Sequence, residues 1–283
     1  MVDINKIFNA KMTPSDFYKL SNFITQNYGI KMPIAKKIML QSRLQKRLRA
    51  LNITSYKEYI EFLFSKKGIQ EEMHHMIDMV STNKTDFFRE PSHFDFLSNY
   101  ILPEFLKRNS GKQLFKIWSA GCSSGEEPYT IAMVLSEFIL LNPTFDFSIF
   151  GTDVSTRMLQ KAVSAIYDEE RVNIIPINLK KKYLLRSKNS EKRTVRIIAN
   201  LRYKANFKRL NFIDETYHIN ELFDVVFCRN VLIYFDRETQ ENVISKLCTK
   251  IKKGGYFFLG HSESIINMDL PLKQVKPTVF RRT

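Results

Sequence analysis

The chain has 283 residues, of which 44% are hydrophobic and 13% aromatic, so it can bury a substantial core as one large domain or two modest ones. It contains no run of about twenty apolar residues and no cationic start followed by an apolar run, so we expect neither a membrane span nor a secretory signal. The three cysteines, Cys122, Cys228 and Cys248, form no CxxC pair, which favours free thiols and a cytoplasmic protein.

The net charge of +15 is concentrated in two segments. Residues 31–50 carry seven Lys or Arg and no acid, and residues 180–209 carry twelve with a single acid, so the rest of the chain is slightly acidic. Such patches attract nucleic acid, an anionic membrane or an acidic protein surface, and they can also serve solubility alone. Charge by itself does not choose among these partners.

The first 80 residues predict helices only, with apolar residues at helical spacing in segments 17–24, 34–51, 55–64 and 69–80. Within 34–51 we expect one buried apolar stripe and a set of basic residues that face outward. The stripe consists of Ile34, Ile38, Leu44, Leu48 and Leu51. The basic residues are Lys36, Lys37, Arg43, Lys46 and Arg47.

From about residue 113 the pattern alternates between strands and helices. Strands are predicted at 114–119, 145–151, 223–228 and 256–259, with helices at 155–165 and 236–252, the second ended by Gly254 and Gly255. This alternation predicts an α/β fold with a mostly parallel sheet covered on both faces. Residues 166–205 interrupt the alternation, and a hairpin of 194–198 with 201–203 would make them a small inserted subdomain.

Residues 117–128 form a small-residue loop between a predicted strand and a predicted helix. The loop lacks a full GxGxxG pattern, so it is either a tight structural turn or a loop that approaches a ligand. Glu126 and Glu127 at the helix start would repel a pyrophosphate. They suit a cationic ligand such as S-adenosylmethionine, which carries an ammonium and a sulfonium.

Polar side chains end two further predicted strands. Asp153 follows Gly125 by 28 residues, where an acid accepts hydrogen bonds from ribose hydroxyls, although it could equally cap the next helix. Arg229, Asn230 and, one turn later, Tyr234 reach the same sheet edge, as functional groups or as an ordinary strand-end turn. Together these residues predict an adenosyl-cofactor site at the carboxyl ends of the strands.

Four separated motifs carry a resemblance to a known family. They are residues 82–90 (TNKTDFFRE), 118–129 (WSAG to GEEPY), 227–236 (FCRNVLIYFD) and 260–263 (GHSE). In these motifs the chain resembles the chemotaxis receptor methyltransferases, the CheR family of protein-glutamate O-methyltransferases. The resemblance implies an all-α N-terminal domain at 1–80 and a linker at 81–92. It also implies a Rossmann-like class I methyltransferase domain at 93–283, with an antiparallel β-subdomain inserted at about 166–205.

The resemblance also implies the chemistry: methyl transfer from S-adenosylmethionine to a glutamate γ-carboxylate, which leaves S-adenosylhomocysteine. Arg89 and Tyr234 match the family's proposed catalytic residues. The implied cofactor contacts are Asn83, Thr85, Arg89, Gly121, Glu127, Asp153, Asn211, Phe212, Arg229 and Asn230. A glutamate carboxylate is ionised at neutral pH, so the reaction needs no general base. No His/Cys cluster with metal-ligand spacing occurs, so no metal is expected.

The implied partners are the acidic cytoplasmic helices of methyl-accepting chemotaxis receptors. By resemblance the N-terminal domain docks there through Lys36, Lys37, Arg43, Lys46 and Arg47, and the membrane is met only through the receptors. Some relatives bind a receptor pentapeptide at a glycine-containing loop of the β-subdomain. Residues 186–193 contain no glycine, so we do not expect that tether. We expect a monomer, and the patch at 180–209 has no assigned partner.

Two other functions compete with this interpretation. A nucleic-acid methyltransferase would suit the charge, but no nucleic-acid module is visible and residues 229–232 differ from the Asn-Pro-Pro-Tyr type motif of base methylases. A non-catalytic receptor-binding adaptor would keep the fold. Intact motif residues argue against it, because an idle copy would be free to lose some of them.

Overall fold

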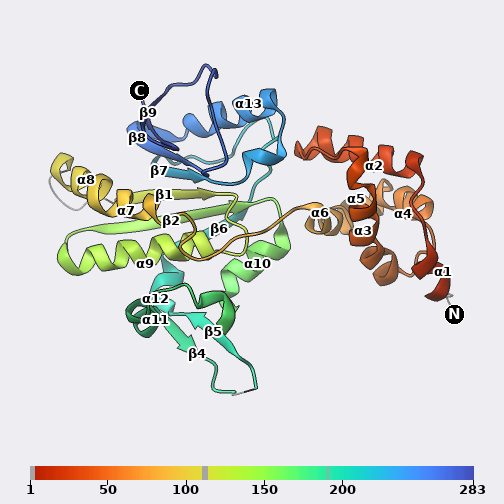
Figure 1. Cartoon of the computed structure of the whole chain (residues 1–283), viewed down its shortest axis with the longest axis horizontal. Helices are drawn as coiled ribbons and strands as arrows, with labels where there is room; N and C mark the ends of the chain where they lie inside the picture. The colour runs from red at the N-terminus through yellow and green to blue at the C-terminus, as the bar shows by residue number, and fades with distance from the viewer. Residues whose placement is uncertain (1–3, 110–113, 190) are drawn as a thin grey trace.

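The computed structural model describes residues 4–109, 114–189 and 191–283, which form a helical part followed by an α/β part (Figure 1). The helical part has a core of its own that includes Phe17, Leu44 and Tyr59. Helix α2 begins with a capping box between Thr13 and Asp16, and it ends at a left-handed Gly29. The helices are α1 (Ile4–Asn9), α2 (Pro14–Tyr28), α3 (Lys37–Leu51), α4 (Tyr56–Leu63), α5 (Lys66–Glu71) and α6 (Met73–Val80).

The predicted apolar stripe on α3 is only partly right. Leu44 and Leu48 are buried, together with Leu40, but Ile34 and Ile38 are 50% and 79% exposed. Residues Ile34–Lys36 form a separate 3-10 turn. Ile38 lies six residues before Leu44, a spacing that places the two side chains on different faces of an α-helix.

The α/β part is built on a 7-stranded sheet of order β6-β2-β1-β7-β8-β10-β9. Strands β6, β2, β1, β7 and β8 run parallel to one another, and β10 runs antiparallel to both β8 and β9. This confirms the mostly parallel sheet; the antiparallel C-terminal pair is additional. The strands are β1 (Leu114–Ala120), β2 (Asp146–Asp153), β6 (Ala205–Arg209), β7 (Phe223–Cys228), β8 (Ile251–Leu259), β9 (Leu272–Lys276) and β10 (Val279–Arg282).

Helices cover both faces of the sheet (Figure 1). Alternate residues of β7 enter different cores: Val225 and Phe227 join the core shared with α7–α9, whereas Val226 and Cys228 join the core shared with α13. A strand buried on both sides is therefore apolar throughout. The helices are α7 (Ser92–Phe96), α8 (Leu102–Arg108), α9 (Glu126–Leu141), α10 (Thr156–Ser164) and α13 (Arg237–Cys248), with a π-helix at Leu97–Ile101 and 3-10 turns at Glu169–Val172 and Leu232–Tyr234.

Two sequence predictions about this part are wrong. Helix α13 ends at Cys248, and Gly254 and Gly255 lie inside β8 rather than ending the helix. The pairing of β7 with β8 shifts register between Phe223 and Val225, and a Cβ on Gly255 would lie 2.8 Å from the Asp224 carbonyl oxygen. The glycines thus permit a β-bulge in β8, a feature that glycine often marks within strands.

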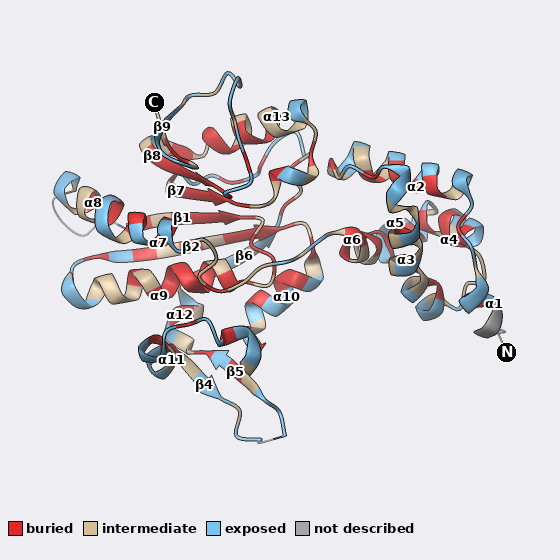
Figure 2. Ribbon diagram, viewed as in Figure 1, coloured by how far each residue is buried: buried red, intermediate tan, exposed pale blue. Residues whose placement is uncertain are grey.

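The inserted subdomain contains a 3-stranded sheet of order β3-β5-β4. The predicted hairpin partner at 201–203 is wrong, because Leu201 is buried in α12 and β5 pairs instead with β3 and β4. The β4–β5 hairpin extends from the body of the molecule and is largely exposed at its tip (Figure 2). The elements are β3 (Ile166–Asp168), α11 (Ile177–Tyr183), β4 (Leu184–Arg186), β5 (Thr194–Ile197) and α12 (Ala199–Tyr203). Among the described helices, none is long and apolar enough to cross a membrane.

Candidate cofactor and catalytic site

A cavity of about 300 Å³ lies at the carboxyl ends of β1, β2 and β7, where the helical part meets the α/β part. Every cofactor and catalytic residue expected from the sequence lines it. These are Asn83, Thr85, Arg89, Gly121, Glu127, Asp153, Asn211, Phe212, Arg229, Asn230 and Tyr234. The volume is within the range of small-molecule sites, and the position follows the rule for parallel sheets.

The loop between β1 and α9 forms one wall. Gly121 and Gly125 have φ values of +84° and +94°, which favour glycine, and a Cβ on Gly121 would lie 2.4 Å from a methyl carbon of Val231. The loop is also joined to β2, since the Ser123 N–H donates to Asp153 Oδ2 at 2.8 Å. The loop is thus both a tight turn and a cavity wall, so the two interpretations left open by the sequence are compatible.

Asp153 at the end of β2 lies in a buried setting. Its Oδ1 accepts a hydrogen bond from the Ser155 N–H at 2.9 Å, and the Ser155 hydroxyl caps α10. Burial raises the pKa of Asp153, while the backbone N–H groups of Ser155 and Ser123 act in the opposite direction. The helix cap is therefore Ser155, and Asp153 keeps lone pairs for a ligand.

The two glutamates at the start of α9 have different surroundings: one lines the cavity and the other pairs with an arginine. Glu127 lines the cavity and accepts from the Ser119 hydroxyl at 2.6 Å. Glu126 is buried, and its carboxylate pairs with Arg171 at 2.6 Å. The expectation that both carboxylates serve a cationic ligand is therefore wrong for Glu126.

The end of β7 carries Arg229 and Asn230 to the cavity. Arg229 pairs with Glu127 on one side and with Glu90 on the other. The Glu263 carboxylate accepts from the backbone N–H groups of Asn230 and Leu232 at 2.8 and 2.7 Å. The GHSE motif thus fixes the turn that presents Arg229 and Asn230.

Arg89 and Tyr234 line the cavity from the linker and from the turn after β7. Arg89 lies between Phe88 and Glu90, both with left-handed φ values of +52° and +57°. Such values are uncommon for these residue types, so the surrounding contacts must hold the linker in place. The Arg89 guanidinium donates to the Lys84 carbonyl oxygen at 3.3 Å.

The helical part closes the cavity with residues that the sequence did not assign to the cofactor site, although Lys36 was expected as a docking residue. Ile30, Met32 and Met39 add apolar surface, and Lys36 adds a cation. Backbone and side-chain hydrogen bonds join the parts here. The Lys31 N–H donates to the Tyr234 carbonyl oxygen at 2.9 Å, and the Asn211 amide donates to the Asn27 carbonyl oxygen at 2.7 Å. No local pattern marks these residues, because only the docking of the two parts brings them to the site.

The predicted docking residues do not all face outward. Arg43 donates to the Val80 carbonyl oxygen at 2.6 Å, at the end of α6. Arg47 pairs with the buried Glu72 at 2.6 Å. The outward orientation expected for both arginines is wrong, because α3 packs against α6 on that side. Lys46 is exposed and Lys37 is half-buried.

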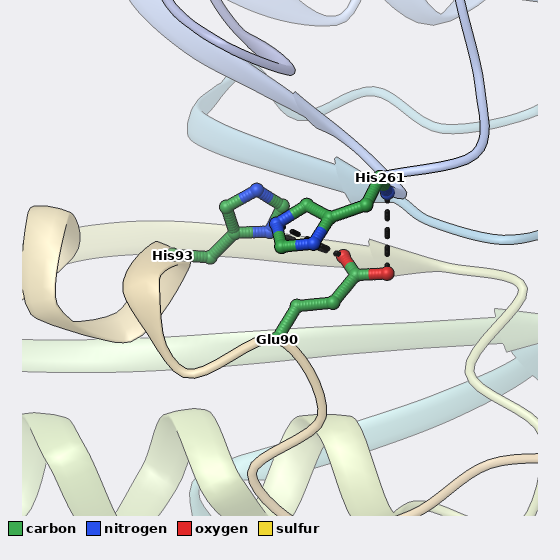
Figure 3. A group of neighbouring side chains, drawn as sticks. All are labelled: Glu90, His93 and His261. Atoms are coloured by element: carbon green, nitrogen blue, oxygen red, sulfur yellow. Dashed lines mark hydrogen bonds and ion pairs between the residues drawn. The ribbon is translucent and has the colours of Figure 1, made fainter.

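Glu90, His93 and His261, which are far apart in sequence, lie together beside Arg229 (Figure 3). Their ligand atoms lie within 4.8 Å of one another, a spacing that a metal ion can bridge. However, the Arg229 Nη2 lies 2.8 Å from Glu90 Oε2 and holds that oxygen in an ion pair. A divalent cation would meet this guanidinium charge at close range, so the group fits an ion-pair network better than a metal site.

Comparison with known families settles the class of the protein. A model of the CheR methyltransferase, SAM binding domain, matches residues 83–281, and a model of the CheR methyltransferase, all-alpha domain, matches residues 15–81. The chain belongs to the CheR methyltransferase family. A chemotaxis protein methyltransferase of Borreliella burgdorferi is 39% identical over 97% of this chain and 96% of its own length. The Escherichia coli protein of the same name is 35% identical over 91% of this chain and 87% of its own length.

As a CheR family member, the chain is an S-adenosylmethionine-dependent methyltransferase with an all-α N-terminal domain, as the motifs predicted. The residues of the cavity fit that molecule. Glu127 offers free carboxylate lone pairs for an ammonium, Asp153 offers them for ribose hydroxyls, and Phe212 adds an aromatic surface to the same wall.

Proposed function

We propose that this chain methylates the γ-carboxylate of glutamates on the acidic cytoplasmic helices of methyl-accepting chemotaxis receptors, giving glutamyl methyl esters. One observation carries the proposal: a single cavity combines acidic groups, Glu127 and Asp153, with cationic groups, Arg89 and Lys36. The acids suit the cationic methyl donor, and the cations suit a second ligand that is itself an anion. The relatives' names, chemotaxis protein methyltransferases, support the same biological role.

The proposed mechanism is largely one of positioning. S-adenosylmethionine, when bound, supplies a methyl group activated by its positive sulfur. The substrate carboxylate is already ionised at neutral pH, so no residue has to remove a proton. Arg89 holds one carboxylate oxygen by a charge-assisted hydrogen bond, and the Tyr234 hydroxyl donates to orient the group. These two residues are our proposed catalytic residues.

The cofactor contacts follow from the lining of the cavity. We propose that Glu127 binds the amino group of the cofactor and Asp153 its ribose hydroxyls. Asn211 and Phe212 lie beside the adenine, and Gly121 allows the β1–α9 loop to approach the ligand closely. Asn83 and Thr85 from the linker, together with Arg229 and Asn230, complete the site. No resident metal is part of this proposal.

Receptor docking is proposed for the basic surface of α3, where Lys46 is exposed and Lys37 is half-buried. Lys37 and Lys46 on α3 contact the acidic receptor helix, while Lys36 at the cavity guides the substrate glutamate inward. Arg43 and Arg47 are left out, because their guanidinium groups are used within the domain. We propose no pentapeptide tether, since the β4–β5 loop lacks glycine, and we propose that the protein acts as a cytoplasmic monomer.

We divide the chain into a docking domain at 1–80, a linker at 81–92 and a methyltransferase domain at 93–283. The linker reaches from the end of α6 to α7 and supplies Asn83, Thr85 and Arg89 to the cavity. Limited proteolysis of the protein with and without S-adenosylhomocysteine tests this division. We expect ligand to protect the linker from cleavage.

The proposal is tested by incubating the protein with methyl-labelled S-adenosylmethionine and receptor-containing membranes, followed by mild alkali. We expect label in the receptor band and its release by alkali as methanol, which indicates a carboxyl methyl ester. Nucleic acid added in a parallel reaction serves as the competing acceptor. Alkali-stable label on nucleic acid would overturn the proposal in favour of a nucleic-acid methyltransferase. Absence of label, from protein that binds S-adenosylhomocysteine, would indicate a non-catalytic adaptor.

A further inference from the structure

Arg229 lies between two carboxylates that differ in their access to the cavity. Its side chain is only 2% exposed. Nη1 donates to Glu127 Oε2 at 3.1 Å, whereas Nε and Nη2 donate to Glu90 Oε2 at 3.2 and 2.8 Å. Of the three hydrogen bonds from the Arg229 guanidinium to carboxylates, two go to Glu90 and one goes to Glu127.

This division matters because Glu127 lines the cavity, and in the proposed function it binds the cofactor ammonium. A carboxylate offers about four lone-pair positions. The Ser119 hydroxyl and Arg229 Nη1 occupy one each, so positions remain for a ligand. Without a second carboxylate, the buried guanidinium would keep Glu127 as its only ion-pair partner among the described residues. It would then pair with Glu127 more fully and compete with the cofactor for the same oxygens.

Glu90 is itself firmly held. Its Oε1 accepts from the His261 N–H at 3.2 Å and from the Asn230 side-chain amide at 3.4 Å (Figure 3 shows the former). His93 Nδ1 lies 3.6 Å from Glu90 Oε2, while its Nε2 lies 2.8 Å from the Thr278 hydroxyl. Burial raises the pKa of Glu90, but the hydrogen bonds and charge of Arg229 outweigh it and leave the pKa below its usual value. Glu90 thus stays ionised at neutral pH.

We propose that Glu90 is a positioning residue that holds the Arg229 guanidinium and so keeps the Glu127 carboxylate available to the cofactor. Glu90 acts through Arg229 and touches no ligand itself. The inference rests on the proposed role of Glu127 in binding the cofactor amino group, and it is independent of which substrate receives the methyl group.

A double-mutant cycle tests the inference with the dissociation constant for S-adenosylhomocysteine, measured by calorimetry on the full chain. We expect Glu90→Gln to weaken binding about tenfold in the otherwise unchanged protein, since it removes one buried counter-charge. In the Glu127→Gln background, Glu90→Gln should weaken binding less than about twofold, because the Glu127 carboxylate that it affects is already absent. Additive losses in the two backgrounds, or no loss from Glu90→Gln alone, would overturn the inference.

Two further variants separate positioning from general damage. Glu104→Gln removes another carboxylate that pairs with an arginine, Arg281, at 2.9 Å, but Glu104 is not among the residues that line the cavity. It should leave the dissociation constant unchanged. If Glu90→Gln does not fold, the cycle is run with Glu90→Asp, which keeps the charge on a shorter side chain. The inference then requires Glu90→Asp to bind within about threefold of the unmodified protein, and a larger loss that persists in the Glu127→Gln background would contradict it.

Discussion

Asp153 shows how one carboxylate can serve both the fold and a ligand. Its two oxygens each accept a backbone N–H, from Ser123 and from Ser155, so the loop after β1 and the start of α10 are fixed to the same group. The remaining lone pairs of Asp153 are available to a ligand in the cavity. The side chain is therefore oriented before any ligand arrives, which lowers the entropy lost on binding.

We predict that Asp153→Asn weakens S-adenosylhomocysteine binding by about ten- to a hundredfold, since two charge-assisted hydrogen bonds to ribose lose their charge. Isothermal titration calorimetry measures this. Asparagine keeps the side-chain shape but has one acceptor oxygen, so one of the two backbone N–H groups loses its partner and thermal unfolding of the free protein should also occur at a lower temperature. Binding is therefore measured at a temperature at which both proteins are folded. An affinity equal to that of the unmodified protein would remove Asp153 from the cofactor site.

Arg89 is expected to act on the reaction rather than on the cofactor alone. Arg89→Ala should lower the turnover number about tenfold or more at saturating S-adenosylmethionine, because the substrate carboxylate loses its charged partner. Arg89→Lys keeps the positive charge but lacks the paired N–H donors, so its turnover number should lie between those of Arg89→Ala and the unmodified protein. Initial rates of receptor methylation measure the effect, and equal rates for all three proteins would argue against a catalytic role.

His93 gives a pH dependence of stability. Burial, followed by the charge of Arg229, lowers the pKa of His93 to about 3 from its usual 6.5. The unfolded chain therefore binds one more proton than the folded chain between these values, so stability falls as the pH falls below about 6.5. The slope is at most about 1.4 kcal/mol per pH unit. Urea unfolding from pH 7 to 5 should show a smaller slope for His93→Gln, and identical slopes would contradict this account.

The sequence revealed more about the motif residues than about the charged ones. Gly121, Asp153 and Arg229 lie at the carboxyl ends of neighbouring parallel strands, so their convergence could be predicted. Arg43, Arg47 and Glu126 could not be assigned in this way. Their roles depend on partners from other elements, Glu72 and Arg171 among them, and one-dimensional charge counts do not show such pairs.

At the scale of elements, α6 and α10 connect the two parts of the chain close to the cofactor site. Asp78 of α6 is buried and accepts from the Ser155 hydroxyl at 2.6 Å. Ser155 also donates its N–H to Asp153, so a residue of the helical part supports the ribose-binding position through one intermediate.

We expect Asp78→Ala to destabilise the protein by about 1–3 kcal/mol, because the buried Ser155 hydroxyl loses its acceptor. Cofactor affinity should fall as well. Asp78→Asn keeps an acceptor oxygen and is the matched control, with a smaller loss. Urea unfolding and calorimetry measure the two effects. A fully stable Asp78→Ala variant with normal affinity would show that this contact supports neither the fold nor the site.

Periodicity predicted the central elements well, because β1, β2, β7 and α10 have the apolar patterns that their buried faces require. Periodicity failed where the same residue type occurs in two kinds of structure, such as glycine at helix ends and in bulges. Gly254 and Gly255 permit a bulge in β8 instead of ending α13, and Leu201 is buried on a helix instead of a strand. Ile30 and Met39 lie at the cavity only because the two parts dock, which no local pattern encodes.

At the scale of the whole molecule, the positive charge separates into residues that stabilise the fold and residues that remain free for a partner. We predict that Lys46→Glu raises the KM for receptor roughly threefold or more while leaving cofactor affinity unchanged, because Lys46 is exposed. Arg47→Glu should instead destabilise the helical part by about 3 kcal/mol or more, since it leaves the buried Glu72 unpaired beside a second carboxylate. Equal effects of the two variants on KM and stability would contradict the separation.

The proposed reaction depends on the acidic and cationic sides of one cavity acting on two ligands together. Tandem mass spectrometry of receptor peptides, after incubation of receptor membranes with the protein and S-adenosylmethionine, tests this most directly. We predict a methyl group on glutamate side chains of the acidic cytoplasmic helices, and about ten- to a hundredfold less of it when Asp153→Asn replaces the unmodified protein at limiting cofactor. A methyl group on any other residue type, or unmodified receptor despite measurable cofactor binding, would contradict the proposed function.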